Sequence, residues 1–389
     1  MTGFSLADFL AFFTPGNLVV LITLAAIYAL FSLGLNLQWG FTGLINFGHV
    51  AFLTIGAYAT VLLSLKGVPL ILAVLVGAVL AAILGLGIGI STLRLREDYL
   101  AIVTIGVSEV VRLIALNEEW LTRGALGIPI PNQLLPLGNL TAPTFASRLV
   151  MVAIWTVIFA IGGWQVWRWM RRPPHDRGKP LEVATPTAIP VSNWLWGFAV
   201  GLIGLLLYQA GVSSLLFDYS YKSGLMLLVV VVLALVYWRL EVLVRSPWGR
   251  VLKAIREDEE VAKALGKNVF WYKIQSLMLG GAIAGVAGAF FAWNLTFINP
   301  DGFIPLITFY AWVMVVLGGS GNNAGTLLGA AIFQIYFTVT RFALPALIPL
   351  DDARLGALRL MVIGLLLIVL MMARPQGILG KKEELTLGR

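Results

Sequence analysis

Long apolar runs, each about as long as one bilayer crossing, dominate this chain of 389 residues. A helix needs about twenty mainly apolar residues to cross the hydrocarbon core of a membrane. Only 12% of the residues are charged, roughly half the share in an ordinary soluble domain, so a polar coat is missing. Such runs occur at 17–37, 43–63, 68–92, 99–117, 147–168, 194–212, 223–243, 272–294, 304–318, 325–345 and 356–373. The chain is therefore predicted to be an all-α integral membrane protein, a polytopic helical bundle forming one transmembrane domain over residues 1–389.

The number of crossings is predicted to be ten or eleven. The run at 304–318 is short, and the glycine-rich stretch Gly318-Gly319-Ser320-Gly321 follows it directly. Glycines allow a helix to break inside a membrane. This run is therefore expected to be either a full span, a half-helix or a re-entrant segment.

Basic residues in the loops predict the orientation, because Lys and Arg accumulate on the cytoplasmic side of a membrane protein. When the charged segment 245–271 is placed inside, 18 of the 27 Lys and Arg residues lie on the inner side. The C-terminus is then cytoplasmic, segment 118–146 is an external loop, and the proline-rich segment 170–193 is a cytoplasmic linker. The net charge of +8 is attributed to the basic residues of this inner face, which lies next to membrane lipid, so no nucleic-acid partner is expected.

One segment, Arg250 to Gly266, is highly charged and has a helical pattern of apolar residues. It is predicted to be an amphipathic cytoplasmic helix between two spans, and Gly266 is expected to end it in a left-handed conformation. Two interpretations remain open for this short helix. It is either a surface helix held by ion pairs, or a coupling helix that docks into a groove of a partner protein.

Polar residues cluster with glycines inside the second half of the first apolar run and the start of the next. Polar groups are costly in hydrocarbon and usually face a bundle interior or a cavity. A broken helix end there would offer N–H groups and carbonyls to a zwitterion. The alternative is hydrogen bonding between closely packed helices. The residues concerned are Asn36, Gln38, Thr42, Asn46 and His49.

Two other pairs of polar residues are candidates for the pathway. Glu109 and Arg112 are three residues apart on one span and share a helix face, which favours an ion pair over a substrate contact. Asn322 and Asn323 belong to the glycine-rich block Gly318–Gly329, for which two interpretations remain open, an inner gate and simple glycine packing.

Several chemistries are excluded by composition. The chain has no cysteine and only two histidines, so no cysteine- or histidine-rich metal site is expected, and His175 is interpreted as a solvated loop residue. No phosphate-binding G-x-x-x-x-G-K-[ST] motif occurs, so no nucleotide cofactor is expected in this chain. The chain is thus predicted to be a transport component and not an enzyme, and its energy must come from another subunit or an ion gradient.

The charged segment and several other blocks resemble one known family. Glu260-Val261-Ala262, three residues and then Gly266 resemble the E-A-A-x-x-x-G loop of ABC-importer permeases, and the preceding run 253–259 is similar to that of the LivM-type permease subunits of branched-chain and neutral amino acid importers. The same family is indicated, in the same order, by the blocks at 34–58, 93–113, 315–330 and 374–377. The long insert around 118–222 is similar to the cyanobacterial neutral amino acid importer permeases.

The resemblance implies a partner set and a mechanism. It implies a second permease subunit, two cytoplasmic ABC ATPases that bind ATP-Mg, and a periplasmic substrate-binding protein, all at a bacterial inner membrane. Transport of neutral or branched-chain amino acids would proceed by alternating access, coupled to the ATPases through Arg256, Glu257, Asp258, Glu260, Ala262 and Gly266. The alternatives are an importer of urea or short amides, or an ion-coupled secondary transporter that uses Glu109.

Overall fold

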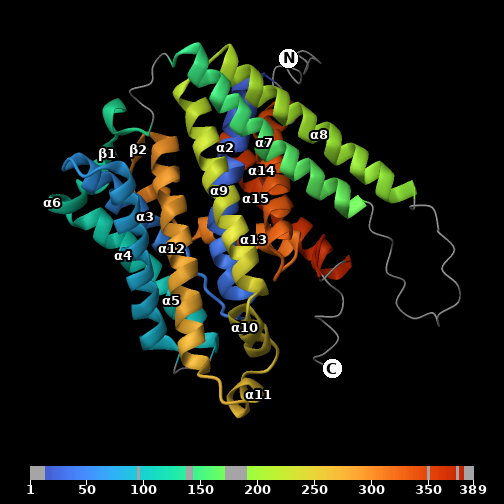
Figure 1. Cartoon of the computed structure of the whole chain (residues 1–389). Helices are drawn as coiled ribbons and strands as arrows, with labels where there is room; N and C mark the ends of the chain where they lie inside the picture. Colours follow the sequence, from blue (N-terminus) through green and yellow to red (C-terminus); the bar gives the residue numbers. More distant parts are fainter. Residues whose placement is uncertain are drawn as a thin grey trace, which may run out of the picture.

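The structure is a computed structural model that describes residues 14–93, 97–136, 143–170, 191–347, 351–373 and 376–380. It is a bundle of helices (Figure 1). Each of the eleven apolar runs lies on a helix over all or most of its length. These helices are α2 (Pro15–Leu35), α3 (Val50–Leu65), α4 (Leu70–Thr92), α5 (Glu97–Asn117), α7 (Phe145–Met170), α8 (Val191–Leu216), α9 (Tyr221–Arg245), α12 (Val269–Leu295), α13 (Leu306–Gly318), α14 (Asn323–Leu347) and α15 (Asp352–Ala373).

Within the described part of the chain, seven helices are long and apolar enough to cross a membrane. Two further apolar helices are shorter, at Val50–Leu65 and Gly204–Leu216. The all-α membrane bundle predicted from the sequence is therefore confirmed, and the chain is a multi-pass membrane protein.

Short elements join the long helices at the two ends of the bundle. One end carries α6 (Glu119–Thr122), the 3₁₀ turns η2 (Gly124–Leu126), η3 (Asn132–Leu134) and η4 (Pro300–Gly302), and a ribbon of β1 (Ile128–Pro129) with β2 (Phe297–Ile298). The other end carries α10 (Pro247–Glu257) and α11 (Glu259–Ala264). The 27-residue helix α12 separates them, since α11 precedes it and β2 follows it (Figure 1).

Helix α12 packs on α2, α3 and α4, and glycines let its neighbours approach it closely. A Cβ on Gly56 of α3 would lie 2.0 Å from the carbonyl oxygen of Gly285, and one on Gly288 would lie 2.1 Å from that of Leu53. Small residues at helix crossings of this kind allow close van der Waals packing where lipid provides no hydrophobic drive. The contact fixes α3 and α4 against α12.

The second apolar run is not helical over its whole length. The sequence predicts a span at 43–63, but α3 begins only at Val50, and residues 43–49 have no regular structure. A helix of 16 residues is about 24 Å long, which is less than the roughly 30 Å of hydrocarbon. Non-helical chain over residues 41–49, here called the broken segment, completes this crossing.

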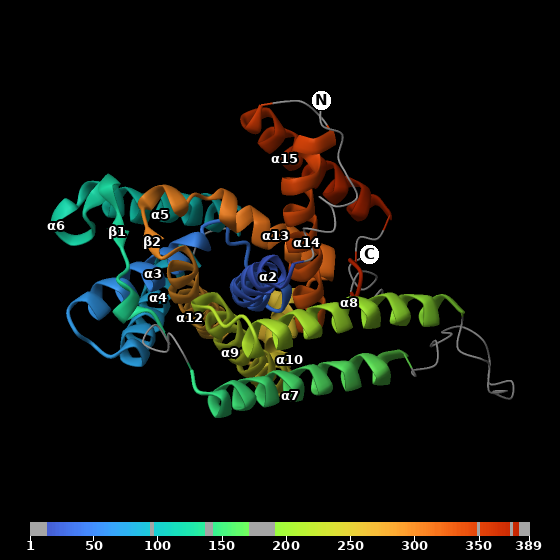
Figure 2. The same cartoon turned by 90° about the horizontal axis from the view of Figure 1, so that it is seen from above.

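Helices α7 and α8 form a hairpin that extends away from the rest of the bundle (Figure 2). They pack mainly on each other, and Trp155 of α7 is fully buried against Phe159 and the backbone of α8. Most of the predicted linker at 170–193 between them, including His175, lies outside the described residues, as do Arg94, Arg96 and the C-terminal residues 381–389.

The segment from turn η4 through the short helix α13 to Ser320 joins the two ends of the bundle. Turn η4, before it, contacts α5 and η2 at the end with the β ribbon. Ser320, just after it, contacts Arg256 of α10 at the opposite end. The run at 304–318 therefore connects both ends and does not turn back, although α13 itself has only 13 residues.

Candidate functional site

Helix α2 ends in a π-helical turn, η1 (Asn36–Gly40), which opens onto the broken segment. The amide of Phe41 donates to the carbonyl of Asn36 at 3.0 Å, which is the wider i to i+5 pattern. The side chain of Asn36 stabilises this turn, because its Oδ1 accepts from the amide of Gly321 at 3.0 Å and its Nδ2 donates to Asn323 at 3.3 Å. Single π turns of this kind often mark functional sites in helices.

The amide side chains of Gln38 and Asn46 fasten the broken segment to α12. Nε2 of Gln38 donates to the carbonyl of Leu277 at 3.1 Å, and Nδ2 of Asn46 donates to Oε1 of Gln38 at 2.9 Å. The hydroxyl of Thr42 lies 2.8 Å from that of Ser276. All of these side chains are buried, and they hydrogen-bond to one another or to α12.

His49 is also buried, at the entrance to α3. Its Nε2 lies 3.1 Å from the carbonyl oxygen of Phe31, and its ring packs between Phe31 and Phe52. Nδ1 of the same ring has no hydrogen-bond partner. The five polar residues predicted from the sequence are therefore gathered at the helix break, where each is bonded to neighbouring protein.

The glycine-rich block forms a tight turn between α13 and α14. Gly319 and Gly321 have φ values of +110° and +75°, which side chains rarely adopt. The segment 376–380 packs directly on this turn. The amide of Ile378 donates to the carbonyl of Leu317, and that of Leu379 to Gly318, both at 3.0 Å.

Both predicted asparagines of this block have defined partners. Nδ2 of Asn322 donates to the carbonyl of Leu379 at 2.8 Å, which holds the 376–380 segment in place. Asn323 begins α14 and donates to Oε2 of Glu241 on α9 at 3.2 Å, in addition to its bond with Asn36. The two residues thus connect the turn with three other parts of the bundle.

Arg256 of α10 points inward to the same place. Its guanidinium donates to the carbonyl of Gly40 at the end of η1, and to the hydroxyl of Ser320 at 3.4 Å. Gly43 lies over its stem, where an added Cβ would be 3.6 Å from the Cα of Arg256. One side chain therefore links α10 to the π turn, the broken segment and the glycine turn.

The predicted single amphipathic helix at Arg250–Gly266 is wrong, because the chain breaks at Asp258. That residue has extended backbone angles (φ −156°, ψ 110°) and separates α10 from α11. Its Oδ1 accepts from the amides of Glu260 at 2.9 Å and Val261 at 3.1 Å, which makes it the N-cap of α11. An Asp followed by acidic residues is a helix-start signal, and the sequence D-E-E contains it.

Helix α11 exposes most of its surface. Val261 is 55% exposed and Leu265, one turn later, is 71% exposed. The acids Glu257 and Glu260 are exposed beside them. An apolar pair surrounded by charges is typical of a surface that docks into a partner.

Ala262 and Gly266, two other predicted coupling residues, stabilise the fold of α11. Ala262 is buried against Ile255 and Val269. Gly266 has a φ of +74°, and the amide of Lys267 donates to the carbonyl of Ala262 at 3.2 Å, so the expected left-handed end of the helix is confirmed.

An ion pair that the sequence analysis missed joins α11 to α12. Nζ of Lys273 lies 2.5 Å from Oε2 of Glu259, and Nζ of Lys263 lies 3.1 Å from Oε1. Partial burial raises the pKa of the Glu259 carboxyl, but the hydrogen bonds from Lys273 and Lys263 outweigh this effect and hold that pKa below its usual range. Lys273 is 14 residues from Glu259, so helical spacing gave no signal for this contact.

The predicted ion pair between Glu109 and Arg112 is present on α5. Nε of Arg112 donates to Oε2 of Glu109 at 3.0 Å. Arg112 also lies 3.8 Å from a carboxylate oxygen of Asp301 in η4, a partner that the sequence did not reveal. The carboxylate side chain of Glu109 remains 38% exposed on the surface of this chain.

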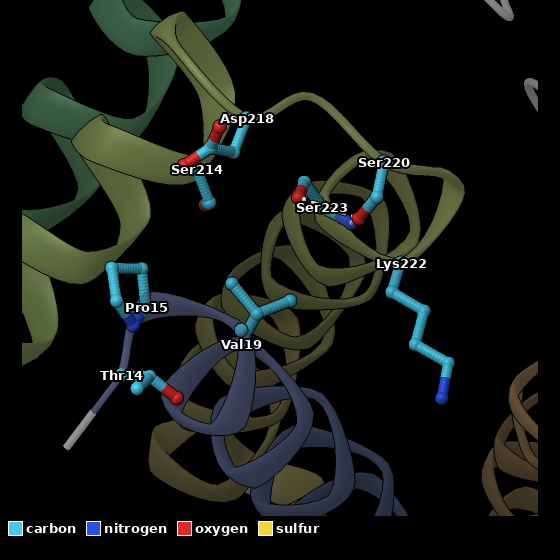
Figure 3. Close-up of a pocket in the computed structure, with 9 residues that line it drawn as sticks. Thr14, Pro15, Val19, Ser214, Asp218, Ser220, Lys222 and Ser223 are labelled. Atoms are coloured by element: carbon cyan, nitrogen blue, oxygen red, sulfur yellow. Dashed lines mark hydrogen bonds between the residues drawn. The ribbon is translucent and has the colours of Figure 1, made fainter. Parts of the chain in front are cut away.

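A cavity of about 410 Å³ lies between the starts of α2 and α9 and the end of α8 (Figure 3). Pro15, Val19, Ser214, Asp218 and Ser223 are among the residues that line it. Lys222 extends away from the other labelled side chains in Figure 3. None of the predicted site residues lines this cavity.

Comparison with known proteins finds one family whose model matches most of the chain. It is described as the branched-chain amino acid transport system permease component, and it matches residues 17–172 and 208–371. No solved structure matches the chain.

Several curated proteins are similar along nearly the whole chain. The high-affinity branched-chain amino acid transport system permease protein LivM of Escherichia coli is 28% identical, over 95% of this chain and 71% of its own length. A probable branched-chain amino acid transport permease protein LivM of Methanocaldococcus jannaschii is 26% identical over 92% of both chains. The permease protein LivH of Salmonella typhimurium is 25% identical over 93% of this chain and 94% of its own.

Proposed function

Because the chain belongs to the family of branched-chain amino acid transport permease components, we propose that it imports branched-chain or other neutral amino acids as one permease subunit of an ATP-driven importer. The observation that supports this function best is the exposed surface of α11. It presents an apolar pair and acidic side chains at one end of a membrane bundle. The chain has no phosphate-binding loop of its own, so the driving subunit must attach from outside.

The proposed partners are a second permease, two ABC ATPases that bind ATP-Mg, and a soluble substrate-binding protein. Similarity to both LivM and LivH proteins supports a pair of unlike permeases. In a bacterial inner membrane, α10 and α11 would face the cytoplasm together with the C-terminus, and the β1–β2 ribbon would face the binding protein. No comparison favours the urea or short-amide alternative.

The proposed mechanism is alternating access driven through α10 and α11. Glu257, Glu260, Val261 and Leu265 would contact the ATPase. A movement of α11 would pass to α12 through the Glu259–Lys273 pair. A ligand shifts the equilibrium between two conformations only by the difference in its affinity for them. ATP binding at the ATPases would supply this difference and so shift the permeases between their two states.

Reconstitution tests this function directly. We expect proteoliposomes containing both permeases, the ATPase and the binding protein to accumulate labelled leucine only with internal ATP. The matched control is the same importer with a catalytically inactive ATPase, which should not accumulate leucine. Uptake by this chain alone, driven by an ion gradient without ATP, would instead establish a secondary transporter.

A further inference from the structure

The broken segment, which has no regular backbone structure, reaches the surface of this chain at three residues. Gly43, Ile45 and Phe47 are each partly exposed, although the residues between them are buried. Irregular backbone does not face lipid, since hydrocarbon satisfies none of its polar groups, and it is tolerated only inside protein or beside water. Lipid therefore does not cover this face of the bundle.

Aromatic side chains collect on the same face. The ring centroid of Trp312 on α13 lies 4.4 Å from that of Trp39 and 5.0 Å from that of Phe47, and Phe47 stacks on Phe309 at 5.5 Å. Phe309 is 45% exposed. The indole N–H of Trp312 donates to the carbonyl of Asn46 at 3.1 Å, which fixes the rings to the broken segment.

Helix α5 borders this face. The amide of Phe47 donates to the hydroxyl of Thr104 on α5 at 3.2 Å. Figure 2 shows α5 and α13 on the side of the bundle opposite to α7.

The outer face of α4 provides a contrast. Over residues 70–83 its exposed residues are all aliphatic, its backbone is helical throughout, and no charged side chain occurs on the helix. They are Ile71, Leu72, Leu75, Val76, Val79, Leu80 and Ile83. These are the properties of a surface that faces lipid.

We propose that Trp39, Phe47, Phe309 and Trp312 line a water-filled pathway between this chain and the second permease, and that their rings contact the aliphatic side chain of the amino acid in transit. This inference rests on the proposed import function. The rings supply a large apolar contact area.

The absence of cysteine in the sequence allows a direct test. Phe309→Cys and Val79→Cys are introduced separately, and the complete importer is reconstituted in permeable vesicles. A charged maleimide then labels this chain with and without ATP plus vanadate. A thiolate forms and reacts only in water, so we expect Phe309→Cys to react about tenfold faster than Val79→Cys in at least one state. Saturating leucine should slow that reaction.

Labelling at the slow rate of Val79→Cys in both states, with leucine uptake intact, would overturn the proposal, because the face would then be covered by lipid or by the second permease. If Phe309→Cys does not assemble, Ile45→Cys on the broken segment replaces it, with the same expected result. Failure of the unmodified importer to take up leucine would count against the proposed function, and rapid labelling of Phe309→Cys alone would still establish a water-filled face.

Discussion

Gly48 lies where two backbones touch, and no larger residue fits there. A Cβ at this position would be 1.8 Å from the carbonyl oxygen of Thr104 on α5. The contact explains why the broken segment needs a glycine immediately before α3.

We expect Gly48→Ala to destabilise the protein by about 1–3 kcal/mol or more, because backbone atoms must move apart. Gly106→Ala on α5 is the matched control, since nothing lies within 4 Å of that site. The midpoint of thermal unfolding in detergent measures both variants. Equal midpoints would show that α5 does not approach Gly48 this closely.

Arg256 connects α10 with both the π turn and the glycine turn. We expect Arg256→Met to lower ATP-driven uptake about tenfold while ATP hydrolysis continues, because a lost charged hydrogen bond is worth about 1.5–3 kcal/mol. Arg250→Met, on the exposed side of the same helix, should leave uptake within about twofold of wild type. Uptake and ATP hydrolysis of both variants are measured in parallel on the reconstituted importer.

At the scale of elements, Asp258 determines that the charged segment contains two helices. Replacement of an N-cap by Ala typically costs about 1 kcal/mol, whereas Ser or Asn keeps the cap. We therefore expect Asp258→Ala to speed hydrogen exchange at the amides of α11, and Asp258→Asn to preserve their protection. Exchange followed by mass spectrometry over residues 259–264 measures this, and no difference between the variants would contradict the cap.

The ion pair between Glu259 and Lys273 makes the attachment of α11 depend on pH. Because the folded-state pKa of Glu259 is depressed, its stabilising contribution is present above the unfolded value of about 4.3 and is lost as pH falls through the lower folded value. Glu259→Gln removes this contribution at neutral pH, by about 1 kcal/mol after solvent screening. Between pH 6 and pH 3, the protection of the α11 amides should therefore change less in Glu259→Gln than in the wild type. In Glu260→Gln it should change as in the wild type.

At the scale of the whole molecule, the hydrophobic runs were enough to predict the bundle. Most of each apolar run lies on a helix, because a helix satisfies its own backbone without a partner. The residue at which α3 starts was not predictable in the same way. Polar residues and glycines at 43–49 indicate a broken helix end, but contacts between distant residues, such as Gln38 with Leu277 and Val50 with Thr308, stabilise the break.

Contacts between residues far apart in the sequence also explain which features of the candidate site were not predicted. The partners of Arg256 are 216 and 64 residues away, so no local pattern shows that it points inward. The pairing of Glu109 with Arg112 was predictable, since they are one helical turn apart, whereas that of Arg112 with Asp301 was not. Sequence spacing identifies neighbours on one helix but not between helices.

The arrangement of both ends gives a topology that labelling can check. Leu265 on α11 and Leu126 in η2 are both strongly exposed, at opposite ends of the bundle. In sealed right-side-out vesicles, an impermeant thiol reagent should modify Leu126→Cys at once and Leu265→Cys only after permeabilisation. The reverse order would invert the predicted orientation.

The contact between segment 376–380 and the glycine turn also affects how the protein is made. These residues follow every helix of the bundle, so they leave the ribosome after all the helices have been synthesised. Until then, the carbonyls of Leu317 and Gly318 lack the two amides that later donate to them. The glycine turn is consequently locked only after the described helices have been synthesised. A ribosome that stalls before residue 376 would release a chain whose helices can all insert but whose inner turn remains open to quality-control proteases.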